Sequence, residues 1–170
     1  MRVRHALVLV LVAAACGGDG GAGPADDDYF SRLERTSETA HIQERGLRRD
    51  LRVRLDEAAT TDERMDVVTV FVDQSARLYQ DVVDALRQLD APDDLAAPQR
   101  AYLEAWQGQL DLVVAVRDAG FSSPPRILKQ FELAPFRDAA KEIQARCEDL
   151  QAAVAANGSA VDLVCDGRPA

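Results

Sequence analysis

The chain has 170 residues and a formal net charge of -9 at pH 7, because its 29 acidic side chains outnumber its 20 lysines and arginines. This acidity argues against nucleic-acid binding, whose affinity comes largely from neutralised phosphates, and against peripheral binding to anionic lipid. The length is enough for one domain with a real hydrophobic core and too short for two.

The first sixteen residues, MRVRHALVLVLVAAAC, place two arginines before a short apolar run and small residues before Cys16. The apolar stretch from Ala6 to Ala15 has ten residues, whereas a membrane-spanning helix needs about 20. This is the layout of a secretory signal. With cysteine directly after the small residues, it resembles a bacterial lipoprotein signal.

The resemblance implies that residues 1–15 are removed, that Cys16 is lipidated, and that the protein is extracytoplasmic and anchored to the bacterial cell membrane. Ala13 stands where the usual motif has leucine, so plain cleavage after Ala15, which releases a soluble secreted protein, is the alternative. Either cleavage leaves 155 residues with a charge of -11, because the signal carries two arginines. Residues 16–27 are rich in glycine and predict a flexible linker that spans about 17–20 Å.

The first amphipathic helix is expected over residues 28–59, where apolar side chains recur at three- and four-residue spacing. Ser37 and Glu44 occupy the same face as these apolar residues. Residues 60–63 predict a break and a new helix cap. The second helix, over 62–89, has the widest apolar stripe and is therefore expected to be the most central.

A third helix is expected over about 98–118, and Gly120 is expected to cap its end. Residues 121–125 predict a loop that cannot be helical at its prolines. A last helical region runs to about residue 157. It is expected to form a short helix, a kink near Pro135 and then the main helix, since proline removes a backbone hydrogen bond. Four amphipathic segments with short connections predict an all-α domain over 28–157, an antiparallel up-down four-helix bundle.

Two cysteines remain besides Cys16, and a pair in an exported chain is most simply a disulfide between Cys147 and Cys165. The tail, residues 158–170, would then be tied back along the bundle. Metal ligation is the competing interpretation, but two thiolates without nearby companions fall short of a four-ligand site.

Glu38-Thr39-Ala40-His41 places a carboxylate and an imidazole one helical turn apart, as in di-iron bundles. Such a site needs that motif twice, and His41 is the only histidine after the signal. We therefore expect His41 to face solvent. Haem-attachment and Gly-x-Ser-x-Gly motifs are absent from the sequence, so neither an enzyme nor a bound cofactor or metal is predicted.

Two further side-chain groups are candidate binding residues. Arg45, Arg48, Arg49 and Arg52 share one helix face and could meet an anionic partner, although interleaved acidic residues favour a plain solvated face. Tyr102, Trp106 and Phe136 could line an apolar pocket, although aromatic side chains at helical spacing are more often core.

The sequence thus predicts a non-enzymatic binding or interaction module of the cell envelope, with envelope proteins as candidate partners and no nucleic acid. The alternative is an extracytoplasmic binder that holds an apolar or cationic small molecule between helices. A metal-dependent enzyme is the least favoured of the three.

Overall fold

The computed structural model describes residues 24–165, and all regular secondary structure in this range is helical. The five helices are α1 (Pro24–Glu57), α2 (Thr61–Arg87), α3 (Ala96–Asp118), α4 (Pro124–Glu132) and α5 (Ala134–Ala156). The predicted all-α class is therefore confirmed for these residues. Residues 1–23, with the predicted signal and Cys16, lie outside the described residues.

The first helix starts earlier than expected. α1 begins at Pro24, four residues before the predicted start, so the end of the predicted linker is helical. Proline suits the first turn of a helix because that turn has no partner for its N–H group. α1 then continues through Gly46 to Glu57 without a break.

The prolines near the C-terminal half also act at helix starts. Pro124 and Pro125 form the first turn of α4, so the expectation that both lie in a loop is wrong. Leu133 is extended, with φ -72° and ψ 160°, and separates α4 from α5. Pro135 then lies in the first turn of α5. The short helix and the main helix expected on either side of this point are therefore present as α4 and α5, and the expected kink is a break at Leu133.

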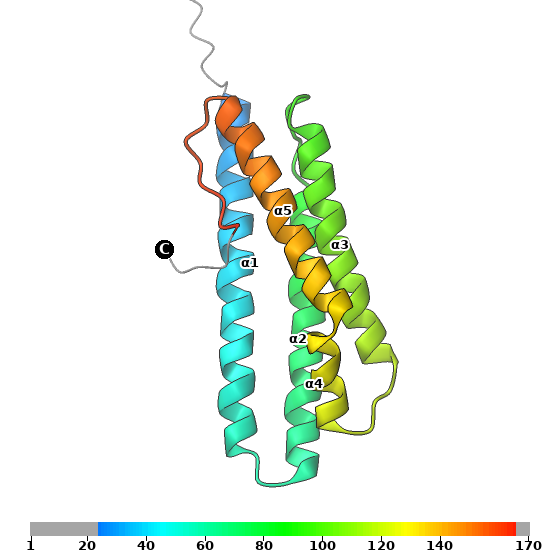
Figure 1. Cartoon of the computed structure of the whole chain (residues 1–170). Coiled ribbons are helices and arrows are strands. Elements are labelled where there is room, and N and C mark those ends of the chain that lie inside the picture. The colour runs from blue at the N-terminus through cyan, green and yellow to red at the C-terminus, as the bar shows by residue number, and fades with distance from the viewer. Residues whose placement is uncertain (1–23, 166–170) are drawn as a thin grey trace, which may run out of the picture.

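The four longer helices lie lengthwise beside one another, and the short α4 covers one end of α2 (Figure 1). α1 packs against α2, α2 against α3, and α3 against α5. Apolar side chains from these helices and from the α2–α3 connection form the core. Its largest fully buried members are Leu33, Val68, Val83, Leu86, Leu95, Val113, Leu150 and Val154.

The predicted break between the first two helices is confirmed as a capping box. The Glu63 N–H donates to the Thr60 hydroxyl at 3.2 Å, and the Thr60 N–H donates to the Glu63 carboxylate at 2.9 Å. These two bonds satisfy N–H groups that the first turn of α2 leaves free. They fix the point at which the chain reverses.

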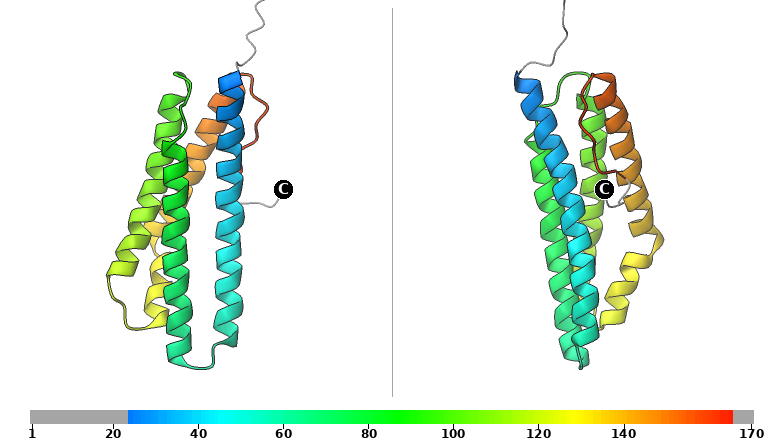
Figure 2. Two further views of the ribbon diagram at one scale, coloured as in Figure 1. Left: turned by 180° about the vertical axis from the view of Figure 1, so that it is seen from behind. Right: turned by 90° about the vertical axis from the view of Figure 1, so that its left-hand side faces the viewer.

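The tail returns along α5, as the sequence predicts. Gly158 allows the turn, because its φ of +78° is strained for other residues. The tail then runs between α1 and α5 (Figures 1 and 2). Cys165 forms the predicted disulfide with Cys147, with 5.3 Å between their Cα atoms. Leu163 is buried beside them.

Replacing both Cys147 and Cys165 with serine should lower the free energy of unfolding by about 3 kcal/mol, because the bridge closes a loop with a sequence separation of 18. Urea denaturation measures this change. A reducing agent should lower the unfolding midpoint of the native chain and leave that of the double variant unchanged. A native midpoint that does not respond to complete reduction would contradict the prediction.

Candidate functional site

A partly open cavity of about 180 Å³ lies within the bundle, and four helices and the tail supply its lining. α1 contributes Ser37, His41 and Glu44 to it. Their spacing of four and then three residues places them in one row along the helix. Ser37 is buried, and the other two are half-buried. A row of polar side chains therefore faces the interior where an apolar row would be usual.

α3 contributes a second row with the same spacing, Tyr102, Trp106 and Gln109, and all three side chains are buried. Tyr79 of α2 completes this wall. The Trp106 ring lies 5.6 Å from the Tyr79 ring and 6.2 Å from the Tyr102 ring, measured between centroids. Three aromatic rings thus form one side of the cavity.

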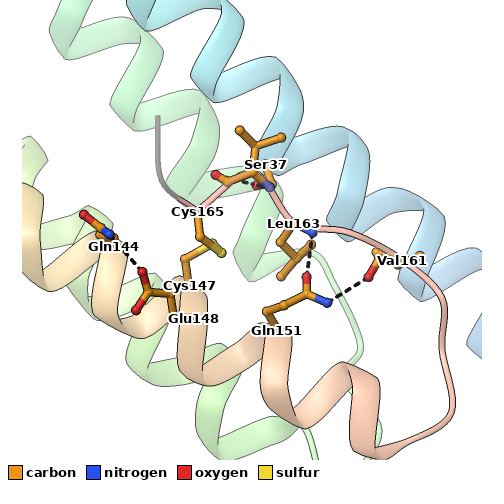
Figure 3. Close-up of a disulfide and its surroundings, with 9 residues drawn as sticks. Ser37, Gln144, Cys147, Glu148, Gln151, Val161, Leu163 and Cys165 are labelled. Atoms are coloured by element: carbon orange, nitrogen blue, oxygen red, sulfur yellow. Dashed lines mark hydrogen bonds between the residues drawn. A yellow bond between two sulfur atoms is a disulfide. The ribbon is translucent and has the colours of Figure 1, made fainter. Parts of the chain in front are cut away.

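α5 and the tail supply further lining residues, including both cysteines of the disulfide. The Val164 N–H donates to the Ser37 hydroxyl at 3.1 Å, which joins the tail to α1. The Gln151 side chain accepts from the Leu163 N–H at 2.6 Å and donates to the Val161 carbonyl at 2.9 Å (Figure 3). These bonds and the disulfide hold the tail across the gap between α1 and α5.

Glu44 is the centre of a small charged network at the cavity. Its Oε1 atom accepts a hydrogen bond from the Arg48 guanidinium at 2.7 Å and another from the Tyr79 hydroxyl at 3.2 Å. Burial raises the pKa of the Tyr79 phenol, and the neighbouring Glu44 carboxylate raises this pKa further. The Tyr79 hydroxyl therefore stays protonated and remains a donor to Glu44.

Three polar atoms of the lining residues are buried without a hydrogen-bond partner in the described protein: His41 Nε2, Trp106 Nε1 and Gln109 Oε1. The Trp106 N–H lies beside the Tyr102 hydroxyl, but not in hydrogen-bond geometry. An unpartnered buried polar group costs about 1–3 kcal/mol. These covered atoms therefore lower the stability of the interior around the cavity.

Only two of the three aromatic residues predicted to line a pocket line the cavity. Tyr102 and Trp106 line the cavity, whereas Phe136 is buried against Phe131 with 4.6 Å between the ring centroids. Phe131 in turn contacts Phe71 of α2. Phe136 therefore helps to attach α4 and the start of α5 to the bundle. The walls near Tyr102 and Trp106 are polar as well as aromatic.

His41 does not face solvent as expected. It is half-buried and its Nε2 atom is covered, because it follows buried Ser37 by four residues in the row that faces the cavity. Glu38, the carboxylate of the considered metal motif, is exposed, and Glu44 is the carboxylate that lines the cavity with His41. Residues 24–165 contain no group of three or more histidine, cysteine or acidic side chains placed to bind a metal.

The predicted arginine face is exposed along its length. Arg48 makes the ion pair with Glu44, four residues before it, as interleaved charges predict. Arg45, Arg49 and Arg52 do not line the cavity. A role for this face in binding a partner stays a prediction.

Comparisons with protein-family models, curated proteins and solved structures found no match. The site must therefore be interpreted from its own chemistry. In the part of the chain that the structure describes, no helix is both long enough and apolar enough to cross a membrane.

Gln151→Met should lower the free energy of unfolding by about 1–3 kcal/mol, because it leaves the Leu163 N–H and the Val161 carbonyl without partners. Gln144→Met is the matched control on the same helix. Its amide donates only to the exposed Glu148 carboxylate, at 2.8 Å, so a change within about 0.5 kcal/mol is expected. Chemical denaturation compares the two variants, and equal losses would contradict the assigned role of Gln151.

Proposed function

We propose that this protein is a non-enzymatic binding module that holds a small molecule in the cavity between its helices. The observation that carries the proposal is the cavity of about 180 Å³ with three unpartnered polar atoms among its lining residues. An apolar cavity of about 150 Å³ is large enough to hold benzene. The space is therefore adequate for a small ligand, and the polar and aromatic side chains that line it can contact such a ligand.

We favour binding over catalysis because the hydroxyl and carboxylate groups in the cavity are already hydrogen-bonded within the protein. Ser37 is the lining hydroxyl nearest to His41 along α1, and it is already bonded to the tail backbone. The Glu44 carboxylate is bonded to Arg48 and Tyr79. A nucleophile needs an adjacent general base in hydrogen-bond contact, and Ser37 has none among the described residues. Tyr79 does contact the Glu44 carboxylate, but burial raises the pKa of its phenol, which disfavours the phenolate nucleophile.

The predicted antiparallel up-down bundle is part of this proposal. It is supported by the three-residue connection between α1 and α2 and by the packing order of the long helices (Figure 2). In such a bundle, ligand sites are built in the core from side chains of facing helices. The two rows on α1 and α3 have this arrangement.

Lipid anchoring through Cys16 is the proposed localisation, with plain secretion as the alternative. Its support is the signal-like sequence of residues 1–16 and the disulfide, which is typical of oxidising compartments outside the cytoplasm. The binding domain would then act on the outer side of a membrane. Contact with envelope proteins through the arginine face is a further prediction from the sequence.

Cys16→Ser should prevent lipidation and shift the protein from the membrane fraction to a soluble or uncleaved form, because a stable anchor requires the acyl chains. Fractionation and intact mass of the detergent-extracted protein measure the change. An unmodified Cys16 thiol on mature protein in the soluble fraction would support secretion instead.

Native mass spectrometry of protein isolated from its own cells should show a bound small molecule. Ala140 lines the cavity and is exposed, so Ala140→Phe adds a ring at the open edge of the cavity and should reduce or remove that mass. Ala145→Phe is the control, because Ala145 is exposed on the same helix and does not line the cavity.

Trp106 provides a second measurement, because it is the only tryptophan of the chain and lines the cavity. Its fluorescence should change when ligand-free protein is titrated with a small-molecule extract of the same cells. Empty native protein, together with unchanged fluorescence, would contradict the proposed function.

A further inference from the structure

We infer that the Cys147–Cys165 disulfide is a redox-sensitive latch for the C-terminal tail. Its reduction by a dithiol releases residues 160–165 from α1 and α5 and leaves the five helices folded. The cavity then loses the two lining residues that this segment supplies, Val164 and Cys165, and opens toward solvent on that side. The release does not require a bound ligand, so it does not depend on the proposed function.

Little besides the disulfide holds residues 160–165 on the helices. The segment forms neither helix nor strand. Within the described residues, its hydrogen bonds to the helices come from two side chains, Gln151 of α5 and Ser37 of α1. Leu163 is its one buried side chain, and the others are half-buried or exposed. The non-covalent attachment of the segment is therefore small for its length.

These contacts oppose the conformational entropy that the segment loses when it docks. A hydrogen bond within the protein adds little net stability, because it replaces a hydrogen bond to water. Each docked residue loses backbone freedom, and this loss is at least comparable to the net gain from one hydrogen bond. One buried leucine and the bonds from Gln151 and Ser37 therefore fall short of the cost of ordering residues 160–165. The disulfide compensates, because it restricts the segment before docking.

The helices do not need this segment for their own packing. α1 packs against α2, α2 against α3 and α3 against α5. None of the largest fully buried side chains belongs to residues 160–165. Release of the segment uncovers the side of α1 and α5 along which it runs (Figures 1 and 2). The packing between the helices stays in place, so the loss of the disulfide is expected to act locally.

A dithiol reaches the bridge at Cys165, because Cys165 is half-buried whereas Cys147 is only 1% exposed. A thiolate of the reductant attacks the Cys165 sulfur, the S–S bond breaks, and Cys147 leaves as a thiolate. The second thiol of the reductant, as a thiolate, then attacks the mixed disulfide and displaces the Cys165 thiolate. Both protein thiolates take up the protons that the dithiol has lost to solvent. The protein disulfide is thereby reduced by two electrons, and the dithiol is oxidised to a disulfide.

The test uses the chain from residue 16 onward with Cys16→Ser, so that Cys147 and Cys165 are its only cysteines. Backbone order parameters are measured by NMR relaxation before and after reduction with dithiothreitol, and intact mass verifies that reduction is complete. In the oxidised chain, the Leu163 and Val164 amides should have order parameters of about 0.85, and reduction should lower them below about 0.6. Amides of α2 and α3 should stay near about 0.85 and keep their dispersed chemical shifts.

Alkylation of the two thiols measures whether the cavity opens. The reduced chain is separated from excess dithiothreitol and treated with iodoacetamide, and peptide mass spectrometry follows each cysteine. Cys147 and Cys165 should react at rates within about tenfold of each other, because a released segment no longer covers Cys147 and only buried thiols are inert. A Cys147 that stays unreactive while Cys165 reacts would overturn the opening of the cavity.

The variant with both Cys147→Ser and Cys165→Ser is the matched control, because it lacks the bridge with or without the reductant. Its Leu163 and Val164 amides should have order parameters below about 0.6 in both conditions. Unchanged order parameters at these two amides after complete reduction would overturn the release of the tail. Loss of chemical-shift dispersion throughout α2 and α3 on reduction would show that the bridge holds the whole fold, and this result would also overturn the latch.

Discussion

The attachment of the C-terminal tail to both α1 and α5 is the constraint on which the cavity depends. α1 packs on α2 and α5 packs on α3, so the remaining side between α1 and α5 is spanned by the tail. A hydrogen bond from the Val164 N–H reaches Ser37, two bonds reach Gln151, and the disulfide fixes the end. The three hydrogen bonds use backbone groups of the tail, so these groups keep hydrogen-bond partners where the tail covers the core.

The polar interior has a cost that the surrounding apolar packing must offset. Unpartnered polar atoms on His41, Trp106 and Gln109 each reduce stability, and folded domains have a net stability of only about 5–15 kcal/mol. Large apolar side chains next to the lining residues along α1 and α5 are fully buried, among them Leu33 and Leu150. Local departures of this kind from good core design are typical of functional sites.

Much of the helical architecture follows from sequence periodicity, because apolar spacing directly reports which face of a helix is buried. The disulfide was also predictable, since a pair of cysteines in a chain with a signal-like start has few other uses. The prolines were harder to place. Pro24, Pro124 and Pro135 stop a preceding helix but also suit a first turn, and local sequence does not separate these two effects.

The cavity was only partly predictable. Ser37 and Glu44 stand out as polar residues on an apolar face, but Glu38 and Glu44 are each three residues from His41. Spacing alone could not decide which carboxylate accompanies the imidazole. Gln109 carried a similar signal, as a polar residue between Trp106 and Val113. The contact between these rows arises from tertiary packing, which a single sequence does not encode in its periodicity.

Because Val164 and Cys165 line the cavity, docking of the tail and binding of a ligand are coupled equilibria. A ligand that contacts these residues binds more tightly when the tail is docked than when it is released. Thermodynamic linkage then requires that the bound ligand stabilises tail docking by the same factor. A bound ligand would therefore keep the tail docked and protect the disulfide, and a docked tail would in turn strengthen ligand binding.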